Sequence, residues 1–430
     1  MRILHVSHYL PPHSNGGVEN YTVNLASEQA KRGDTVEVFA RGLDTSRDGI
    51  DDVTPRFGGA FRALEMAPGS RPLWTHQRVR WDVDAQFRKL AADFKPDIVH
   101  FQHLLYQSLH LPRIAREAGA ATVFTLHDLW TTCPVVRRVD FRGELCERVP
   151  GLVCAPCIWN GQRARLIPRE TIARVAHSPA KSLLHLAPTM DELGDWLEGT
   201  RRFMADIDLL VCLSRFYANW VTRLGIMAGE AVLSDIGIAR PTCLESPAAS
   251  RPRNAPLRFG VIGSDPLKGV AVAVKAFRQL ADVNARLLVW GKHSENELPS
   301  NVELCGPFGA TEIETVFDSF DVLIAPSLWW ENGMLVIREA FARNKPVIAS
   351  DLAGIAEIVH HEQNGLLFPP GDVNALTDAV RRLISEPQTL ERLRANVRPP
   401  QFLDEHAAQT EKLYDRAQAI NRARMKAKAA

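Results

Sequence analysis

Apolar and polar positions along this chain alternate between two periods. Short, mostly apolar runs are followed by longer segments in which apolar positions recur at helical spacing. This alternation of strand and helix is typical of parallel sheets covered by helices. The pattern predicts two series of strands. The first lies near residues 3–7, 35–40, 97–102, 121–126 and 209–213, and the second near 257–262, 286–290, 302–305, 322–325 and 346–350.

The two series predict an α/β chain with two Rossmann-like domains. A length of 430 residues, 46% of them hydrophobic, is enough for two sizeable cores. We expect the first domain at residues 1–245 and the second at 246–396, with the polar stretch that begins at Cys243 as the linker. Residues 397–430 have a helix-compatible pattern that ends in a basic tail.

Charge and hydropathy argue against nucleic-acid-binding, membrane-spanning and secreted proteins. The formal net charge is +1, and Lys and Arg are not gathered as in a nucleic-acid-binding protein, so we expect no nucleic-acid partner. No apolar run approaches the length of a membrane span. The first seven residues are typical of a strand and not of a signal peptide. We therefore expect a cytoplasmic protein.

Two glutamates separated by seven residues are the most informative motif. The run 321–325 predicts a buried strand, Pro326 and Ser327 end it, and helical spacing begins near Met334. Glu331 should therefore lie in a loop and Glu339 on a helix. Two glutamates near a helix start are ordinarily solvated, so the spacing alone does not assign a function.

The residues at this predicted helix start suit an anion. Unpaired backbone N–H groups at a helix N-terminus, together with the helix dipole, favour phosphate groups. We predict a diphosphate site whose donor-binding residues are Asn332, Gly333, Met334 and Leu335, bracketed by the two glutamates.

Two further segments follow the first strand of each domain, at the edge where α/β sheets bind ligands. Gly16 and Gly17 can bring bare backbone close to a phosphate or an acceptor, although such a pair is also an ordinary turn. Lys268 follows the strand 257–262 and is our candidate cation for the diphosphate; an exposed lysine at a turn is otherwise simply solvated.

Four cysteines form a separate signal. Cys133, Cys146, Cys154 and Cys157 have the spacing C-x12-C-x7-C-x2-C within a turn-rich insert at about residues 130–190. Because a reducing cytoplasm disfavours disulfides, four thiolates with a close C-x2-C pair indicate a structural zinc site. An iron–sulfur cluster and unligated thiols or disulfides are the alternatives, since the first gap is long for a zinc pattern.

Two runs of sequence carry a family resemblance. Residues 326–372, PSLWWENGMLVIREAFARNKPVIASDLAGIAEIVHHEQNGLLFPPGD, resemble the donor-binding half of the retaining GT-B glycosyltransferases of family four, also called glycosyl transferases group 1. The first forty residues are similar to the first strand, glycine loop, helix and second strand of that family. The resemblance implies a GT-B fold, in which two Rossmann-like domains face a cleft and a C-terminal helix crosses back to the first domain.

The resemblance also assigns roles to residues. His127, at the end of the strand 121–126, matches the active-site histidine that holds the transferred sugar; without that context it would be taken for a structural histidine. Glu331 would orient the sugar, Glu339 the ribose, and Lys268 would stabilise the leaving diphosphate. No catalytic metal is expected. Ser264 stands where the family commonly has an arginine. Lys292, Arg338 or a helix dipole could replace its charge; otherwise the leaving group is stabilised less strongly.

These observations predict a retaining glycosyltransferase that uses a UDP- or GDP-sugar and a hydroxyl acceptor such as a polysaccharide or a lipid-linked glycan. A sugar-nucleotide epimerase, or a catalytically weak sugar-nucleotide-binding or regulatory protein, is the alternative. The insert begins directly after His127 and resembles HD-x-W-x-x-CP inserts of a subset of the family. Beyond it, a basic stretch suits either peripheral contact with an anionic membrane or an ordinary amphipathic helix; its cations are Arg163, Arg165, Arg169, Arg174 and Lys181.

Overall fold

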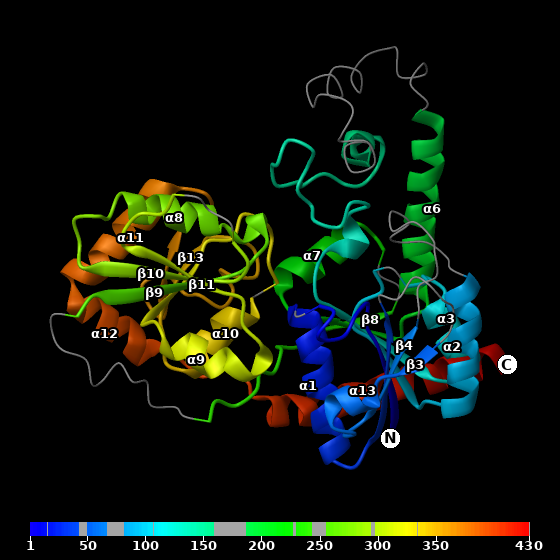
Figure 1. Cartoon of the computed structure of the whole chain (residues 1–430). Coiled ribbons are helices and arrows are strands. Elements are labelled where there is room, and N and C mark those ends of the chain that lie inside the picture. The colour runs from blue at the N-terminus through cyan, green and yellow to red at the C-terminus, as the bar shows by residue number, and fades with distance from the viewer. Residues whose placement is uncertain are drawn as a thin grey trace. The chain divides into compact units, whose positions relative to one another are not determined.

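The chain forms two compact units, seen in the ribbon of Figure 1. The computed structural model describes residues 1–14, 16–42, 50–66, 81–105, 107–158, 186–226, 229–242, 255–293, 297–332 and 334–429. Unit 1 comprises Met1–Ile236 and Leu403–Ala430, and unit 2 comprises Gly237–Phe402. The division falls before the predicted boundary at residue 245, because Ile238 pairs with Phe402 and Thr242 donates hydrogen bonds to Glu314 of unit 2.

Unit 1 is built on an eight-stranded sheet in the order β3-β4-β2-β1-β5-β6-β7-β8. All of its strands pair in parallel except β3, which is antiparallel to β4. The strands are β1 Arg2–Val6, β2 Thr35–Arg41, β3 Ile50–Asp52, β4 Arg62–Met66, β5 Ile98–Phe101, β6 Ala121–Leu126, β7 Leu209–Cys212 and β8 Glu230–Leu233. The central strands are buried on both faces, which explains their continuous apolar runs.

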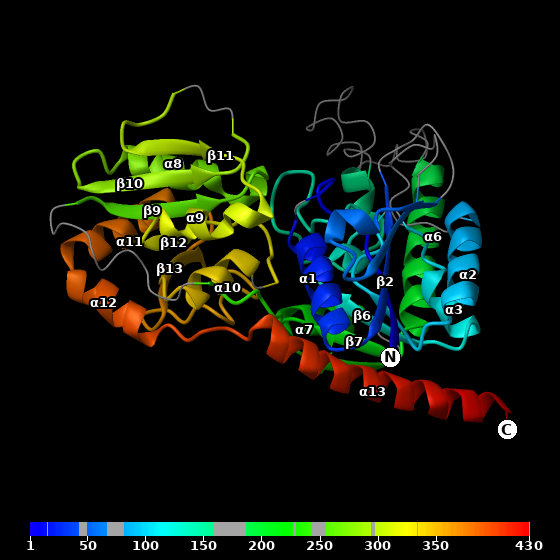
Figure 2. The same ribbon diagram turned by 60° about the horizontal axis from the view of Figure 1, so that its bottom comes forward.

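Helices cover both faces of this sheet. In Figure 2, α1 lies on one face and α2, α3 and α6 lie on the other. The helices are α1 Gly17–Lys31, α2 Trp81–Phe94, α3 Leu111–Glu117, α6 Leu186–Ala205, α7 Arg215–Arg223 and α13 Leu403–Ala429, with short 3₁₀ turns η1 Thr54–Phe57, η2 Trp130–Thr132 and η3 Leu152–Cys154. The insert after β6 is described at residues 130–158 and again from residue 186.

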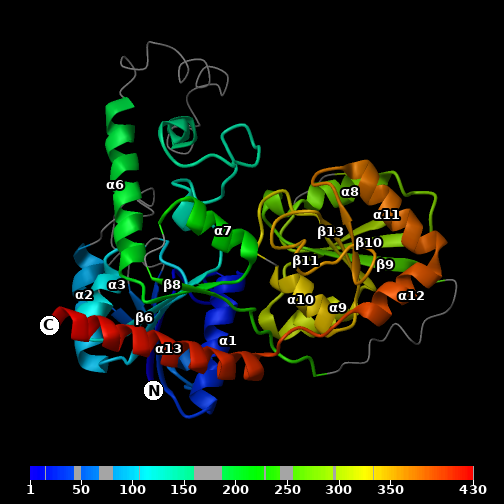
Figure 3. The same cartoon turned by 180° about the vertical axis from the view of Figure 1, so that it is seen from behind.

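The C-terminal helix α13 belongs to unit 1 although it follows unit 2 in the sequence. It packs along β6 and β7 and against α1 (Figure 3). Tyr414 and Ala417 are fully buried in the core of unit 1, and Arg424 forms an ion pair with buried Asp208. The helix is therefore part of the packed core of this unit.

Unit 2 contains a six-stranded sheet in the order β11-β10-β9-β12-β13-β14, all parallel. Its strands are β9 Leu257–Ile262, β10 Ala285–Trp290, β11 Val302–Gly306, β12 Val322–Ala325, β13 Val347–Ser350 and β14 Gly365–Phe368. Figure 1 shows α8 and α11 on one face and α9 and α10 on the other. The helices are η6 Pro266–Lys268, α8 Val270–Arg278, η7 Ala310–Glu312, α9 Ile313–Asp318, α10 Leu335–Ala342, α11 Val373–Ser385 and α12 Pro387–Asn396.

The ten predicted strands are confirmed within a residue or two at each end. Several predictions fall outside the described residues. These are the linker at 243–254, the basic stretch at 163–181, and Gly333. No helix in the described ranges has the length and apolar character that a membrane crossing requires.

Strand order locates the binding edge of each sheet. In unit 2 the chain runs outward from β9 to β10 and β11, then returns to the other side of β9 with β12. In unit 1 the equivalent reversal lies between β1 and β5. Open α/β sheets bind ligands beyond the carboxyl ends of the strands at such a reversal. The loops after β1, β5, β9 and β12 are therefore the first places to look for function.

Candidate functional site

The reversal in unit 2 brings Lys268 and Glu331 into contact. Lys268 ends the short turn η6 after β9, and Glu331 lies in the loop after the neighbouring strand β12. Lys268 Nζ donates to Glu331 Oε1 over 2.6 Å. The lysine side chain is 27% exposed and the glutamate side chain 10% exposed. The pair is therefore shielded on the glutamate side, while the ammonium group keeps access to solvent.

Three donors converge on the same carboxylate oxygen. Besides Lys268, the indole Nε1–H of Trp329 donates to Glu331 Oε1 over 2.5 Å and Ser327 Oγ donates over 3.0 Å. The Lys268 ammonium also lies 5.6 Å from the centre of the Trp329 ring. Hydrogen bonds to the charged form stabilise a carboxylate and hold its orientation. Glu331 is thus a fixed anion, and its Oε2 atom takes no part in these three bonds.

Two glycines allow the backbone to form this loop. Gly263 and Gly269 have positive φ of 156° and 74°. A Cβ at Gly269 would lie 1.8 Å from the carbonyl oxygen of Pro326, a distance no side chain tolerates. Gly269 therefore allows the turn that carries Lys268 to lie directly against the end of β12.

Ser264, which stands in place of the arginine expected from the family, has a structural role here. Its Oγ accepts a hydrogen bond from the backbone N–H of Lys292 over 2.9 Å. His293 Nε2 donates to the carbonyl oxygen of Gly263 over 2.5 Å. These contacts tie the loop after β10 to the loop after β9. Arg338, one of the two candidate replacements, is buried on α10.

The start of α10 and Glu339 form the other part of the predicted donor site. Met334 caps α10, Leu335 is its first residue, and Glu339 lies on the helix while Glu331 precedes it, as the spacing predicts. Asn332 and Met334 are buried. Burial raises the pKa of Glu339 to about 7, against the opposing effect of the Arg343 guanidinium. A carboxyl poised near neutrality in a ligand-binding region marks a functional candidate.

His127 begins a chain of hydrogen bonds that crosses the core of unit 1. Its Nε2 donates to Gln102 Oε1 over 2.9 Å, and Gln102 Nε2 donates to His5 Nδ1. His5 Nε2 in turn donates to Gln29 Oε1, whose amide donates to the hydroxyl of Tyr414. Because His5 accepts at Nδ1 and donates at Nε2, it must be neutral.

Burial favours the neutral form of both His127 and His5, because it lowers the pKa of His127 to about 3 and that of His5 to about 4. The proton of His127 is therefore on Nε2, and Nδ1 is the acceptor nitrogen. The chain continues from the Tyr414 hydroxyl to His100 Nδ1 and from His100 Nε2 to Thr125 Oγ1.

Two further histidine–carboxylate pairs lie beside His127, and the sequence analysis did not single them out. His103 Nε2 donates to Asp128 Oδ2 over 3.0 Å, and His8 Nε2 lies 3.2 Å from Glu19 Oε1. The rings of His8 and His103 are 4.3 Å apart. The pairs come from the loops after β1, β5 and β6 and from the first turn of α1. Their position directly after predicted strands was the signal that could have found them.

Glu19 changes the interpretation of the glycine loop. Gly16 caps α1 in an extended conformation and Gly17 is the first helical residue. Burial alone would raise the pKa of Glu19, but hydrogen bonds with His8 and Ser14 lower it to about 2. The start of α1 therefore already carries a carboxylate, which partly neutralises its dipole. That Gly16 and Gly17 face a diphosphate stays a prediction.

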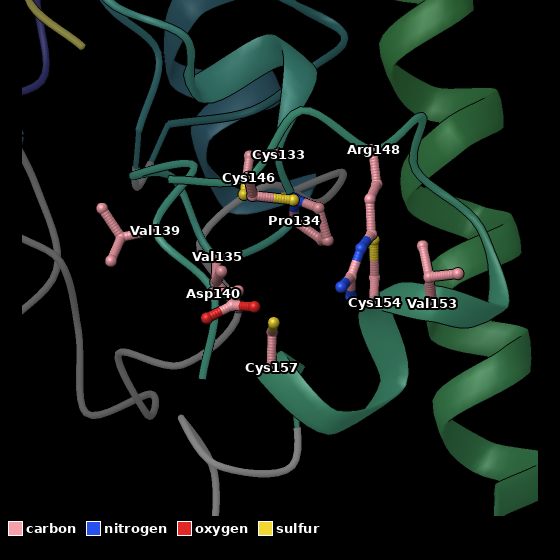
Figure 4. A pocket seen from close by; sticks show the side chains of 10 residues that line it. All are labelled: Cys133, Pro134, Val135, Val139, Asp140, Cys146, Arg148, Val153, Cys154 and Cys157. Atoms are coloured by element: carbon pink, nitrogen blue, oxygen red, sulfur yellow. The ribbon is translucent and has the colours of Figure 1, made fainter. Parts of the chain in front are cut away.

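The four cysteines of the insert line one pocket in unit 1 (Figure 4). None is in a disulfide. Burial raises the pKa of the Cys133 thiol to about 11 and that of Cys157 to about 12. As the side chains lie, no group of three His, Cys, Asp or Glu residues among the described residues is arranged to hold a metal.

Comparison with known proteins relates both units to one family. Residues 15–154 match the family described as Glycosyltransferase Family 4, and residues 256–386 match Glycosyl transferases group 1. The D-inositol 3-phosphate glycosyltransferase of Pseudarthrobacter chlorophenolicus is 31% identical over 400 residues, which span 90% of this chain and 86% of that protein. For three other curated relatives, the aligned region spans 9%, 49% and 59% of the relative's own length.

Solved structures agree on the fold. Sucrose-phosphate synthase (tll1590) from Thermosynechococcus elongatus superposes with a TM-score of 0.67 at 19% identity, covering 97% of this chain and 99% of that one. Anabaena Alr3699/HepE in complex with UDP and glucose superposes with a TM-score of 0.60 at 16% identity, covering 100% of both chains. The α/β fold with two parallel-sheet domains is thus the GT-B fold.

Proposed function

The chain belongs to glycosyltransferase family 4, and we propose that it transfers a sugar from a UDP- or GDP-linked donor to a hydroxyl acceptor with retention of anomeric configuration. The observation that carries the donor site is the Lys268–Glu331 contact at the strand-order reversal of unit 2. A cation and an oriented carboxylate side by side match two adjacent parts of a sugar nucleotide. The cation suits the diphosphate, and the carboxylate suits the hydroxyl groups of a sugar.

Lys268 has the chemistry to bind the diphosphate. An ammonium group has three donors, and Glu331 uses one of them here. The remaining N–H bonds and the start of α10 would hold the phosphate oxygens, since an ammonium and a helix N-terminus both favour anions. Glu331 Oε2 would accept a hydrogen bond from a sugar hydroxyl, and Glu339 would accept one from the ribose. This arrangement needs no catalytic metal.

The proposed reaction is a displacement on one face of the sugar. The bond between the anomeric carbon and the diphosphate oxygen breaks, and its electron pair leaves with the diphosphate. The acceptor oxygen bonds to the anomeric carbon on that same face, and its proton passes to a departing phosphate oxygen. Positive charge builds on the sugar in the transition state, as in other glycosyl transfers. Lys268 and the start of α10 would stabilise the opposite charge on the leaving group.

Unit 1 supplies the residues proposed to hold the sugar and the acceptor. A neutral His127 with its acceptor nitrogen at Nδ1 would bind a sugar hydroxyl without adding a cation beside the positively charged transition state. The acceptor would be a polysaccharide or a lipid-linked glycan. A glycosyltransferase that acts on D-inositol 3-phosphate among the relatives, and the UDP and glucose bound in the Anabaena neighbour, support a sugar-nucleotide donor. Peripheral membrane contact through the basic stretch stays part of the proposal.

The test is the release of nucleoside diphosphate from a donor by wild type and by two lysine variants. Removing one charged stabiliser of a leaving group costs about 10²- to 10³-fold in kcat, so Lys268→Ala should lose that much. Lys275→Ala is the matched control, because Lys275 is exposed on the nearby helix α8. Equal rates for Lys268→Ala and wild type would refute the site. Conversion of the donor sugar without transfer or release would instead favour an epimerase.

A further inference from the structure

The insert between β6 and α6 places four cysteines from two segments around one pocket. Cys133 and Cys146 flank a short hairpin closed by the antiparallel bridge between Val139 and Leu145. Cys154 ends η3 and Cys157 lies three residues later on the helical turn that follows it. Residues at this spacing share one face of a helix. Figure 4 shows all four around one pocket, with the sulfur of Cys157 directed into it.

Backbone donors point at three of these sulfurs. The N–H groups of Val135 and Arg138 form hydrogen bonds with Cys133. The N–H of Gly151 bonds to Cys154, and that of Phe141 bonds to Cys157. A neutral thiol is a weak acceptor, whereas a metal-bound thiolate is a strong one. Such outer donors orient metal ligands and stabilise their charge.

A buried cation, Arg138, lies among the same cysteines. Arg138 is 1% exposed. Its guanidinium donates to Thr132 Oγ1 and to the carbonyl oxygens of Cys146 and Arg148, and it lies 3.6 Å from the centre of the Trp220 ring. Within the described part of the chain, none of its contacts is to a carboxylate. A buried charge without a compensating partner destabilises the folded chain. Negative charge close to Arg138 would therefore stabilise this segment.

We infer that Cys133, Cys146, Cys154 and Cys157 together hold one Zn²⁺ ion as a closed structural site. Four thiolates around Zn²⁺ carry a net charge of −2, which would compensate Arg138 and use the backbone donors. Each thiol releases its proton to solvent as its sulfur bonds to the metal, and no sulfur is oxidised. As the side chains lie, the sulfurs are not arranged to hold a metal, so zinc binding requires the cysteine side chains to turn about their Cα–Cβ bonds between staggered positions.

A zinc ion here would fold the insert and attach it to the rest of unit 1. Cys154 also packs with Ile158 against Leu193 and Trp196 of α6, so the metal site and the apolar contact reinforce one another. Because four protein ligands leave no open position, the ion would take no part in bond breaking. The inference does not depend on the proposed sugar transfer.

The test is elemental analysis of the full chain purified without chelator, supported by Co²⁺ exchange. We expect about one zinc per chain, and a Co²⁺ spectrum with the thiolate charge-transfer and d–d bands of a tetrahedral all-sulfur site. Cys157→Ser should lose zinc, whereas Cys305→Ser, which alters a cysteine outside the insert on β11, should retain it. If Cys157→Ser does not fold, the metal content and the Co²⁺ spectrum of wild type still show whether the four cysteines bind zinc.

Three results would overturn the zinc site. Stoichiometric iron with visible absorption would indicate an iron–sulfur cluster. Absence of metal together with four rapidly titrating thiols would indicate unligated cysteines. Zinc that stays at about one per chain in a folded Cys157→Ser variant would place the ion elsewhere.

Discussion

Replacing Glu339 by glutamine should stabilise unit 2 while weakening donor binding. Burial raises the pKa of the Glu339 carboxyl from 4.5 to about 7. Between pH 4.5 and about pH 7, Glu339 is protonated in the folded chain, whereas in the unfolded chain it has released that proton. The free energy of unfolding therefore falls as the pH rises through this window, and the full penalty is present above pH 7. Glutamine carries no such proton and escapes the penalty.

The size of the effect follows from the shift. A pKa raised from 4.5 to about 7 corresponds to about 3 kcal/mol. Glu339 keeps partial exposure, and solvent screening reduces that value, so we expect about 1 to 3 kcal/mol at pH 8. For a unit of this size, 1 kcal/mol shifts Tm by about 2–4 °C. The unit 2 transition of Glu339→Gln should thus lie about 2 to 12 °C above that of wild type at pH 8 and coincide with it at pH 4.

The assay combines calorimetric melting from pH 4 to pH 9 with donor titrations at the same pH values. Loss of one charge-assisted hydrogen bond to the ribose costs about 1.5 kcal/mol, so donor affinity should fall about tenfold in Glu339→Gln at pH 8. Wild type should lose the same factor as the pH falls below 7. Glu391→Gln is the control, because the Glu391 side chain is 67% exposed on α12. Equal melting of wild type and Glu339→Gln across this range would refute the reasoning.

Three other substitutions test parts of the structure. Gly269→Ala should destabilise unit 2 by several kcal/mol, seen as a lower Tm, because its Cβ would meet the Pro326 carbonyl; unchanged melting would contradict the loop geometry. Tyr414→Phe should lower the stability of unit 1 by about 1–2 kcal/mol, since Gln29 and His100 lose a buried partner, and a neutral effect would contradict the hydrogen-bond chain. His127→Gln should slow transfer without changing the shape of the pH–rate profile, because the histidine is already neutral with a pKa of about 3; loss of a limb near pH 6.5 would show that it titrates.

The strands at the centre of both sheets were predictable from their apolar runs, whereas of the four edge strands only β11 was predicted. The pattern of apolar positions did not predict β3, β4, β8 or β14. In β4 the charged residues Arg62 and Glu65 interrupt the pattern, and β3 contains Asp51 and Asp52. The edge strands β3 and β8 are only partly buried, so their composition resembles that of a loop.

The donor-side residues were predictable because each follows a strand. Lys268 and Glu331 were both singled out, yet their direct contact depends on β9 and β12 being neighbours, and strand order is not encoded locally. The same limit applies to Asp128, which follows β6 and accepts a hydrogen bond from His103 after the neighbouring strand β5.

The polar chain in unit 1 was beyond local inference. His100 and Tyr414 are separated by 314 positions in the sequence and meet only because α13 packs on the sheet of unit 1. Because α13 has few apolar residues, its sequence does not indicate that Tyr414 is buried in the core of unit 1.

Binding of a panel of UDP-, GDP-, ADP- and dTDP-sugars to the full chain, measured by titration calorimetry, tests the central claim most directly. The account predicts selective binding of a UDP- or GDP-sugar, with affinity reduced at least tenfold in Lys268→Ala and unchanged in Lys275→Ala. A folded wild-type chain that binds none of these donors, or binds them equally well without Lys268, would contradict it.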